Sequence, residues 1–272
     1  MLPHMTDGAH PSRPDLTRYD DWLAWLRRQG EQDDDVLVVW VGGSAATGGY
    51  DEWSDLDVDV LVTAGTHEAT YARLTARMRE DFDIDHVWEV PLEWWPDGRQ
   101  CFVCLQHRPG LLEEPTRLVD LHLSSISAAH TRLDVRRHGS PIVLHDPDGL
   151  LELRHDDEDE MATARAKAEV QVRQRRGTDQ WLVNRAIARG HGAEAVSLYL
   201  RFALDPLVRM LRHEHCPWRH DYGLRYLRTD LPVEVAERVE ALVPGWGPGD
   251  LRAQSDACFA WLDELLGQAP AS

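Results

Sequence analysis

The first 150 residues alternate short apolar runs with stretches in which apolar side chains recur at helical spacing. The runs at 36–41 and 55–63 are rich in β-branched residues, which predicts two buried strands. Helical spacing predicts helices over 15–29 and 66–82. Further extended segments are predicted at 85–90, 100–106, 117–123 and 141–149. This succession indicates an N-terminal domain built on a β-sheet.

The second half of the chain carries only helical periods. They are predicted at 161–176, 179–189, 193–214, 219–228, 232–243 and 249–267. The acidic run HDDEDE at 155–160 precedes them and suits either a linker or the first turn of a helix, where carboxylates stabilise the helix dipole. The change of pattern predicts an α+β protein with two domains, 1–152 and 153–272, the second all-helical.

Charge narrows the classes of partner. The 272 residues include 47 acidic and 29 basic side chains, for a formal net charge of −18. Such a surface repels nucleic acid, whose binding depends on basic side chains, and attracts cationic ligands. Solubility explains the same composition equally well. No apolar stretch of membrane-spanning length and no N-terminal signal pattern is present, so we expect a cytoplasmic protein with no membrane partner.

Cysteine and histidine clusters offer two alternative sites. Cys101 and Cys104 form a C-x-x-C motif, but an odd separation on a predicted strand points the two thiols to opposite faces, which disfavours a metal or redox site. His213, His215, Cys216 and His220 do not have the spacing of the usual zinc-ligand pairs. We therefore look for chemistry elsewhere.

Carboxylates interrupt the second predicted strand at every other position. Asp55, Asp57 and Asp59 share one face of that strand, about 6–7 Å apart. Two such carboxylates, with a third from a neighbouring strand, can hold a pair of Mg²⁺ ions about 3.5–4 Å apart, the arrangement used for phosphoryl displacement. Asp120 in the apolar run RLVDLHL is the candidate third ligand; a local cap or ion pair is the alternative. We interpret Asp59 as a structural partner of an arginine.

A glycine-serine turn precedes the acidic strand. If a helix begins at or just after Ser44, its free N–H groups and the serine hydroxyl form an anion site. Gly42 and Gly43 let a phosphate approach the backbone closely. No G-x-x-x-x-G-K and no G-x-S-x-G motif is present, so phosphate chemistry would depend on carboxylates and metal ions.

Together these motifs resemble those of a known superfamily. The order of apolar strand, Gly43-Ser44, ten intervening residues, Asp55-Leu56-Asp57 and a later strand acid resembles the polymerase-beta-like nucleotidyltransferases. The length, the helical C-terminal half and segments such as YLRFALDPLVRML and RHDYGLRYLRTDLP are similar to those of the aminoglycoside adenylyltransferases. The resemblance implies a mixed sheet flanked by helices, followed by a helical substrate-binding domain.

The resemblance also implies a mechanism and its residues. MgATP would bind between the domains, with Gly43, Ser44 and Ser54 on its phosphates. Asp55 and Asp57 would ligate both Mg²⁺ ions. Asp120 would bind the catalytic ion and act as, or position, the general base for an acceptor hydroxyl.

The sequence is compatible with several acceptors of the AMP group. AMP would pass to a small molecule, and the net charge favours a cationic, aminoglycoside-type antibiotic. Transfer to a protein or RNA, as in toxin-antitoxin nucleotidyltransferases, and a catalytically inactive nucleotide-binding module are the alternatives. The resemblance further implies a basic residue and a tyrosine near the nucleotide, and RHDYGLRYL offers candidates at helical spacing: Arg219, His220, Tyr222, Arg225 and Tyr226.

Overall fold

The computed structural model describes residues 14–92, 98–105, 117–127, 131–155, 157–245 and 250–267. The chain divides into two compact units, Met1–His155 and Asp156–Ser272. The first unit extends three residues beyond the predicted boundary at 152, because a short strand at Glu152–Arg154 pairs within it. Gln106, the last residue of one predicted strand, lies outside the described residues.

The first unit is built on a six-stranded sheet with the order β3-β4-β5-β2-β1-β7. β2 and β5 pair in parallel, and the other neighbouring strands pair antiparallel, so the predicted mixed sheet is confirmed. The strands are β1 (Val36–Val41), β2 (Leu56–Val62), β3 (Ile84–Glu89), β4 (Gly98–Leu105), β5 (Arg117–Ser125) and β7 (Ile142–His145). Each predicted strand is present: β1 has the predicted bounds, and the ends of the others differ by up to four residues.

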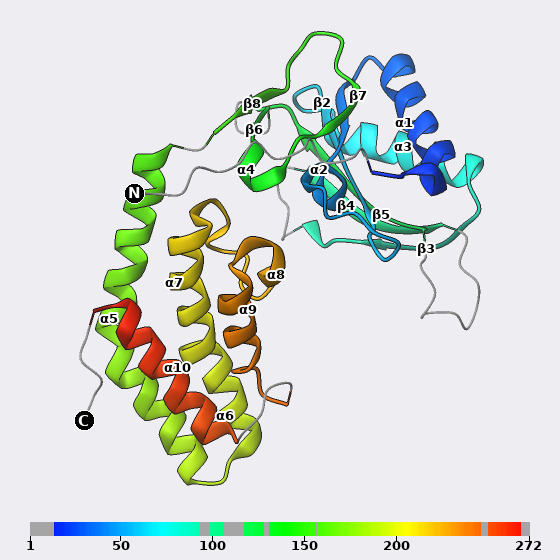
Figure 1. Ribbon diagram of the computed structural model, residues 1–272. Coiled ribbons are helices and arrows are strands. Elements are labelled where there is room, and N and C mark those ends of the chain that lie inside the picture. Colours follow the sequence, from blue (N-terminus) through cyan, green and yellow to red (C-terminus); the bar gives the residue numbers. More distant parts are fainter. Residues whose placement is uncertain are drawn as a thin grey trace. The chain divides into compact units, whose positions relative to one another are not determined.

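Helices cover one face of this sheet (Figure 1). A 3₁₀ turn at Thr17–Tyr19 leads into α1 (Asp20–Gln32), and α3 is His67–Asp81. Buried tryptophans of α1 and apolar side chains of α3 form one core with the alternate residues of β2 and β5. Because successive strand residues point to opposite faces, the acidic positions of β2 lie on the other side of the sheet.

Smaller elements lie beside the sheet. α2 is Gly43–Thr47, and α4 (Val135–His138) begins where the carboxylate of Asp134 accepts a hydrogen bond from Arg137 N, at 2.8 Å. The sequence pattern did not predict β6 (Arg132–Asp134) or β8 (Glu152–Arg154), which pair in parallel as a second sheet. Strands of three residues are too short to show an alternating pattern.

The second unit is helical. Its elements are α5 (Glu158–Ala188), α6 (Gly192–Tyr199), a π-helical turn (Leu200–Leu204), α7 (Asp205–His215), a 3₁₀ turn (Pro217–Arg219), α8 (Leu227–Asp230), α9 (Val233–Glu240) and α10 (Leu251–Leu265). The predicted break between 176 and 179 is wrong, because α5 continues through Gly177. The helix predicted over 219–228 is also wrong, since that segment consists mostly of turns.

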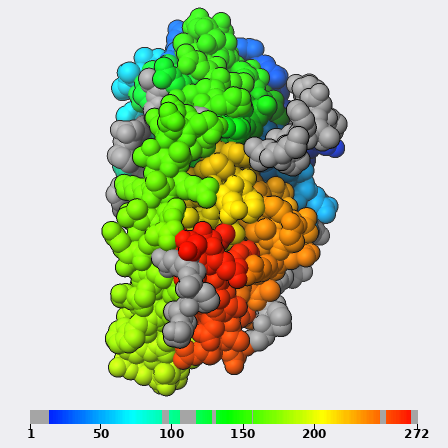
Figure 2. Space-filling model, turned by 60° about the vertical axis from the view of Figure 1, so that its left-hand side comes forward, coloured from blue at the N-terminus to red at the C-terminus, as the bar shows by residue number. Residues whose placement is uncertain are grey.

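α5 and α10 lie side by side in this unit (Figure 2). A buried ion pair joins them, with Arg176 donating to both carboxylate oxygens of Asp263 at 2.7 and 2.6 Å. The guanidinium also lies 4.3 Å from the centroid of the Phe259 ring. No helix of the described ranges is long and apolar enough to cross a membrane.

Core packing in the sheet can be tested at Leu121, which is 1% exposed on the helix-covered face of β5. The change Leu121→Ala is expected to lower the free energy of unfolding by about 2–5 kcal/mol, because it leaves a cavity in a closely packed core. Urea unfolding followed by tryptophan fluorescence measures this loss. Val143→Ala on β7, where the side chain is 48% exposed, is the control and should cost about 0.5 kcal/mol or less. Equal losses in the two variants would contradict the packing described here.

Candidate active site

The parallel pairing of β2 with β5 brings the acidic residues of two distant segments together. Asp57 is the register partner of Asp120, and Asp59 is the partner of His122. Paired residues of neighbouring strands point to the same face and lie about 4.8 Å apart along the hydrogen-bonding direction. We call this set, Asp57, Asp59, Asp120 and His122, the acidic face. Their side chains are neither fully buried nor fully exposed.

Neutral or weakly basic groups contact the acidic face. Gln100 Nε2 donates to both carboxylate oxygens of Asp120, at 2.9 and 3.1 Å. His122 Nδ1 lies 3.3 Å from Asp59 Oδ1. The prediction that Asp59 pairs with an arginine is therefore wrong, because its partner is His122. No arginine of the described ranges forms an ion pair with Asp55, Asp59 or Asp120.

Electrostatics at this face follow from burial and from like charges. Burial raises the pKa of Asp120; the Gln100 amide and the His122 imidazole oppose this rise, and the charges of Asp55 and Asp59 add to it. For His122, burial lowers the pKa, but the hydrogen bond to Asp59 and the surrounding carboxylates outweigh it, so the pKa rises overall. Like charges around Asp120 and the carboxylates around His122 thus act in the same direction, toward binding a proton or a cation at this face.

The glycine turn contacts the acidic face directly. Gly43 has a φ of +53°, and a Cβ added there would lie 1.6 Å from Asp57 Oδ2. Gly42 N donates to Asp57 O at 2.9 Å. The turn and the carboxylate of Asp57 therefore occupy adjoining space that only glycine at position 43 leaves open.

Ser44 follows in this turn and has an unused hydroxyl. Its Oγ is buried and has no hydrogen-bond partner among the described residues. A buried hydroxyl without a partner costs about 1–3 kcal/mol, which a bound ligand can recover. The predicted helix is present as α2 and begins at Gly43, but with five residues it has only a small dipole. Any anion site here depends on the hydroxyl and the backbone N–H groups.

The loop before β2 is fixed by its own hydrogen bonds. Ser54 Oγ donates to Asp51 Oδ1 at 2.9 Å and accepts from Asp51 N at 3.0 Å. Arg18 donates to the carbonyl oxygens of Glu52 and Ser54. Contact of Ser54 with phosphate stays a prediction, since its hydroxyl is engaged within the loop. Arg18 was not predicted from the sequence, because its hydrogen-bond acceptors here are main-chain atoms.

Asp55 ends this loop and stands immediately before β2. Its charge raises the pKa of Asp120, and it also acts on Tyr19, whose pKa burial raises to about 12. In the described part of the chain, no three or more His, Cys, Asp and Glu side chains form a ready-made metal site. The carboxylate oxygens are nevertheless the hard donors that Mg²⁺ prefers. Asp55, Asp57 and Asp120 therefore fit the ion by chemistry and neighbourhood.

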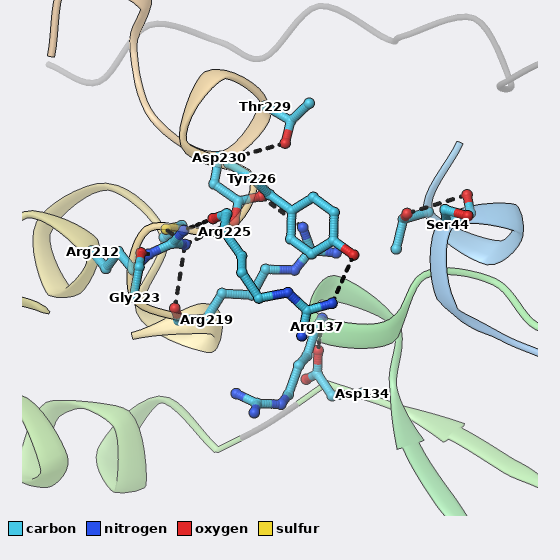
Figure 3. A network of polar contacts seen from close by, with 12 residues as sticks. Ser44, Asp134, Arg137, Arg212, Arg219, Gly223, Arg225, Tyr226, Thr229 and Asp230 are labelled. Carbon is cyan, nitrogen blue, oxygen red and sulfur yellow. Dashed lines mark hydrogen bonds and ion pairs between the residues drawn. The ribbon is translucent and has the colours of Figure 1, made fainter. Parts of the chain in front are cut away.

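The helical unit places the RHDYGLRYL segment around a buried arginine (Figure 3). Arg212 is fully buried, and its guanidinium donates to the carbonyl oxygens of Gly223 (2.7 Å) and Arg225 and to Asp230 Oδ2 (2.7 Å). Arg219 donates to the other oxygen of Asp230 at 2.6 Å. Arg212 was not predicted as a buried residue. It lies on the apolar side of α7, and its place among apolar residues at helical spacing could have indicated that it is buried.

A hollow of about 480 Å³ lies beside this segment. Arg228 and Glu240, on its rim, form an ion pair with nitrogen to oxygen distances of 2.8 and 2.5 Å. Tyr226 has a left-handed backbone, with a φ of +54°. The hollow is lined by Leu224, Tyr226, Leu227, Arg228, Thr229, Glu240 and Val243. Because Glu240 is already paired, this lining suits an apolar group better than a cation.

Burial argues against a metal or redox site at the cysteine motif and at the histidine cluster. β4 places Cys101 on the buried face and Cys104 on the opposite one, as predicted, and both are free cysteines. His213 is 2% exposed, its ring stacks on that of His220 at 4.6 Å, and neither of its nitrogens has a hydrogen-bond partner in the described part of the chain. His213 is thus a neutral core side chain.

The chain matches no protein-family model, and no curated protein shows a significant match to it.

The role of Gly43 can be tested by Gly43→Ala. The new methyl group would displace the carboxylate of Asp57, so we expect affinity for a divalent cation, measured by Mn²⁺ titration, to fall about 10-fold or more. Gly65→Ala is a matched control, because Gly65 has a φ of +81° but nothing within 4 Å of the added Cβ. It carries the same kind of backbone strain and should leave cation affinity unchanged. Equal affinities in the two variants would contradict the steric argument.

The burial of His213 predicts a pH-dependent stability. Burial lowers its pKa to about 4, with His220, Arg209 and Arg165 contributing and Asp221 opposing, against 6.5 as the ordinary value. The unfolded chain therefore binds more protons between these values, and the free energy of unfolding should fall by about 1–3 kcal/mol as the pH drops from 6.5 to 4. Urea unfolding across this pH range, compared with His213→Phe, isolates the effect. The variant should show a flatter dependence, while His155→Phe, at an exposed position, should keep the wild-type slope.

Proposed function

We propose that the protein is a nucleotidyltransferase of the polymerase-beta-like kind, which transfers AMP from MgATP to a hydroxyl of a small molecule. The observation that carries the proposal is the parallel register of Asp57 with Asp120, beside a glycine turn whose Ser44 hydroxyl has no hydrogen-bond partner among the described residues. Carboxylates so paired, with Asp55 close by and no arginine of the described residues bound to Asp55 or Asp120, suit a cation-binding site better than a structural network.

Asp55, Asp57 and Asp120 would hold two Mg²⁺ ions. When bound, the ions neutralise charge that develops at the α-phosphorus and on the leaving pyrophosphate. Asp57 has its carboxylate beside the Gly43 turn and its register partner in Asp120, so it would face both the phosphates and the catalytic carboxylate. The protein thus supplies an acidic, oxygen-rich surface on a rigid sheet.

The remaining roles belong to the turn and to β5. Ser44 Oγ would donate a hydrogen bond to a phosphate oxygen, which gives that buried hydroxyl the partner it lacks within the described chain. Gly43 would let the phosphate reach the backbone, and Ser54 would join once its bond to Asp51 opens. Asp120 would accept the proton of the acceptor hydroxyl or orient the group that does, and burial, which raises its pKa, makes it a stronger base than an exposed aspartate.

The net charge of −18 supports a cationic acceptor of the aminoglycoside type. The apolar hollow in the helical unit favours an acceptor with an apolar group, as in a lincosamide. Protein or RNA acceptors and a nucleotide-binding module without catalysis remain the other candidates. A cationic acceptor would bind more weakly as salt concentration rises, whereas capture of an apolar acceptor would not depend on salt.

The decisive experiment measures pyrophosphate release with Mg²⁺, each nucleoside triphosphate and a panel of aminoglycosides and lincosamides. Asp57→Asn and Asp120→Asn should each lower the rate about 1000-fold, because each removes a ligand worth several kcal/mol of charge stabilisation. Asp85→Asn makes the same charge change on the exposed side of β3 and should leave the rate unchanged.

Several results would contradict the proposal. Turnover by Asp57→Asn at the wild-type rate would exclude the metal role of that carboxylate. No pyrophosphate release with any acceptor would favour a binding module. Radiolabelled ATP that marks macromolecules in a lysate, and not the small acceptors, would favour a protein or RNA substrate.

A further inference from the structure

β4 places a neutral amide against the candidate catalytic carboxylate. Gln100 Nε2 donates to both oxygens of Asp120, at 2.9 and 3.1 Å. In the antiparallel register, Gln100 is opposite His122 and Phe102 is opposite Asp120. The contact therefore runs diagonally between two strands of a paired sheet, on the face that carries the acidic residues.

The amide fixes the carboxylate without using up its capacity to bind a cation. The two oxygens of a carboxylate offer about four lone-pair positions. The amide engages one position on each oxygen, which sets the plane of the group. No other described side chain hydrogen-bonds to these oxygens, so one position on each is left for a metal ion or a proton from a substrate hydroxyl.

Strand alternation keeps the neighbouring arginine, Arg99, away from this position. Arg99 precedes Gln100 and points to the opposite face, where it donates to Glu89 Oε2 at 3.2 Å and lies 4.8 Å from the centroid of the Tyr71 ring. A guanidinium in place of the amide would neutralise Asp120 and compete with a metal ion. The amide orients the carboxylate and leaves its charge in place.

We propose that Gln100 is a positioning residue for Asp120, holding the carboxylate in the orientation that divalent-cation binding requires. This inference rests on the proposed function, and it adds a residue from a third strand to the site. Outer-shell partners of this kind typically change metal affinity or activity by about 10–100-fold when removed. Gln100 touches no reacting atom in this scheme and acts through Asp120 alone.

The test measures Mn²⁺ binding to the full chain by electron paramagnetic resonance, with and without ATP. Gln100→Met keeps the length of the side chain and removes the donor, so its Mn²⁺ dissociation constant should rise about 10–100-fold. Gln100→Asn shortens the side chain by one methylene and should fall between wild type and Gln100→Met. Gln174→Met, on the exposed side of α5, makes the same change away from the sheet and should bind as wild type.

A kinetic readout separates positioning from a loss of structure. In Gln100→Met, the Mg²⁺ concentration for half-maximal pyrophosphate release should rise by the same factor, while the rate at saturating Mg²⁺ falls less. A variant that merely loosens the sheet would lower the melting temperature and leave the Mn²⁺ affinity of the folded protein unchanged. If Gln100→Met does not fold, Gln100→Asn decides the question, and wild-type affinity in that variant would overturn the inference.

The failures of the two proposals are distinguishable. If Asp120→Asn weakens Mn²⁺ binding and the Gln100 variants do not, only the inference about Gln100 is overturned. If the wild-type chain binds no Mn²⁺, either alone or with ATP, both proposals fail.

Discussion

The parallel pairing of β2 with β5 is the constraint on which the site depends. It sets Asp57 beside Asp120 and Asp59 beside His122, on one face. Like charges at neighbouring positions of a sheet destabilise it. The opposite face of β2 anchors the arrangement, since Leu56, Val58 and Val60 are at most 2% exposed and belong to the core formed with α1 and α3. Apolar packing on one side thus holds the repelling groups in place on the other.

Each acidic side chain meets a different kind of neighbour. Asp120 receives an amide, Asp59 an imidazole, and Asp57 lies against the space that Gly43 leaves open. None of these neighbours carries a permanent positive charge. Asp59 and Asp120 are therefore each oriented by a hydrogen bond that does not come from an arginine. A set of arginine partners would have stabilised the sheet more and removed its affinity for a cation.

Part of this site could be predicted from the sequence. The two-residue period of β2 shows that Asp55, Asp57 and Asp59 share a face, and the apolar run around Asp120 shows a strand acid. The pairing register of two segments 63 residues apart is not visible in either pattern. Gln100 and His122 depend on that register and on the pairing of β4 with β5, so the sequence pattern does not reveal them as partners.

The fold, like the site, could be predicted only in part from the sequence. Short runs of apolar residues predicted the central strands, and apolar residues at helical spacing predicted most of the helices. The break near Gly177 was wrong because packing within the helical unit holds α5 together at a residue with low helix propensity. The helix predicted after α7 was wrong for a different reason. Arg212, buried among apolar residues, donates hydrogen bonds to the carbonyl oxygens of Gly223 and Arg225, and these bonds stabilise turns where the periodicity indicates a helix.

The distribution of arginines gives the strongest physical reason to regard the acidic face as a cation site. Arginines do pair with carboxylates elsewhere in this chain, as in Arg73 with Asp33, Arg176 with Asp263 and Arg212 with Asp230. A protein that needed its strand carboxylates only for structure could have paired them in the same way. At Asp59 and Asp120 the partners are an imidazole and an amide instead. Burying part of a carboxylate without a full countercharge is unfavourable unless a cation from solution completes the site.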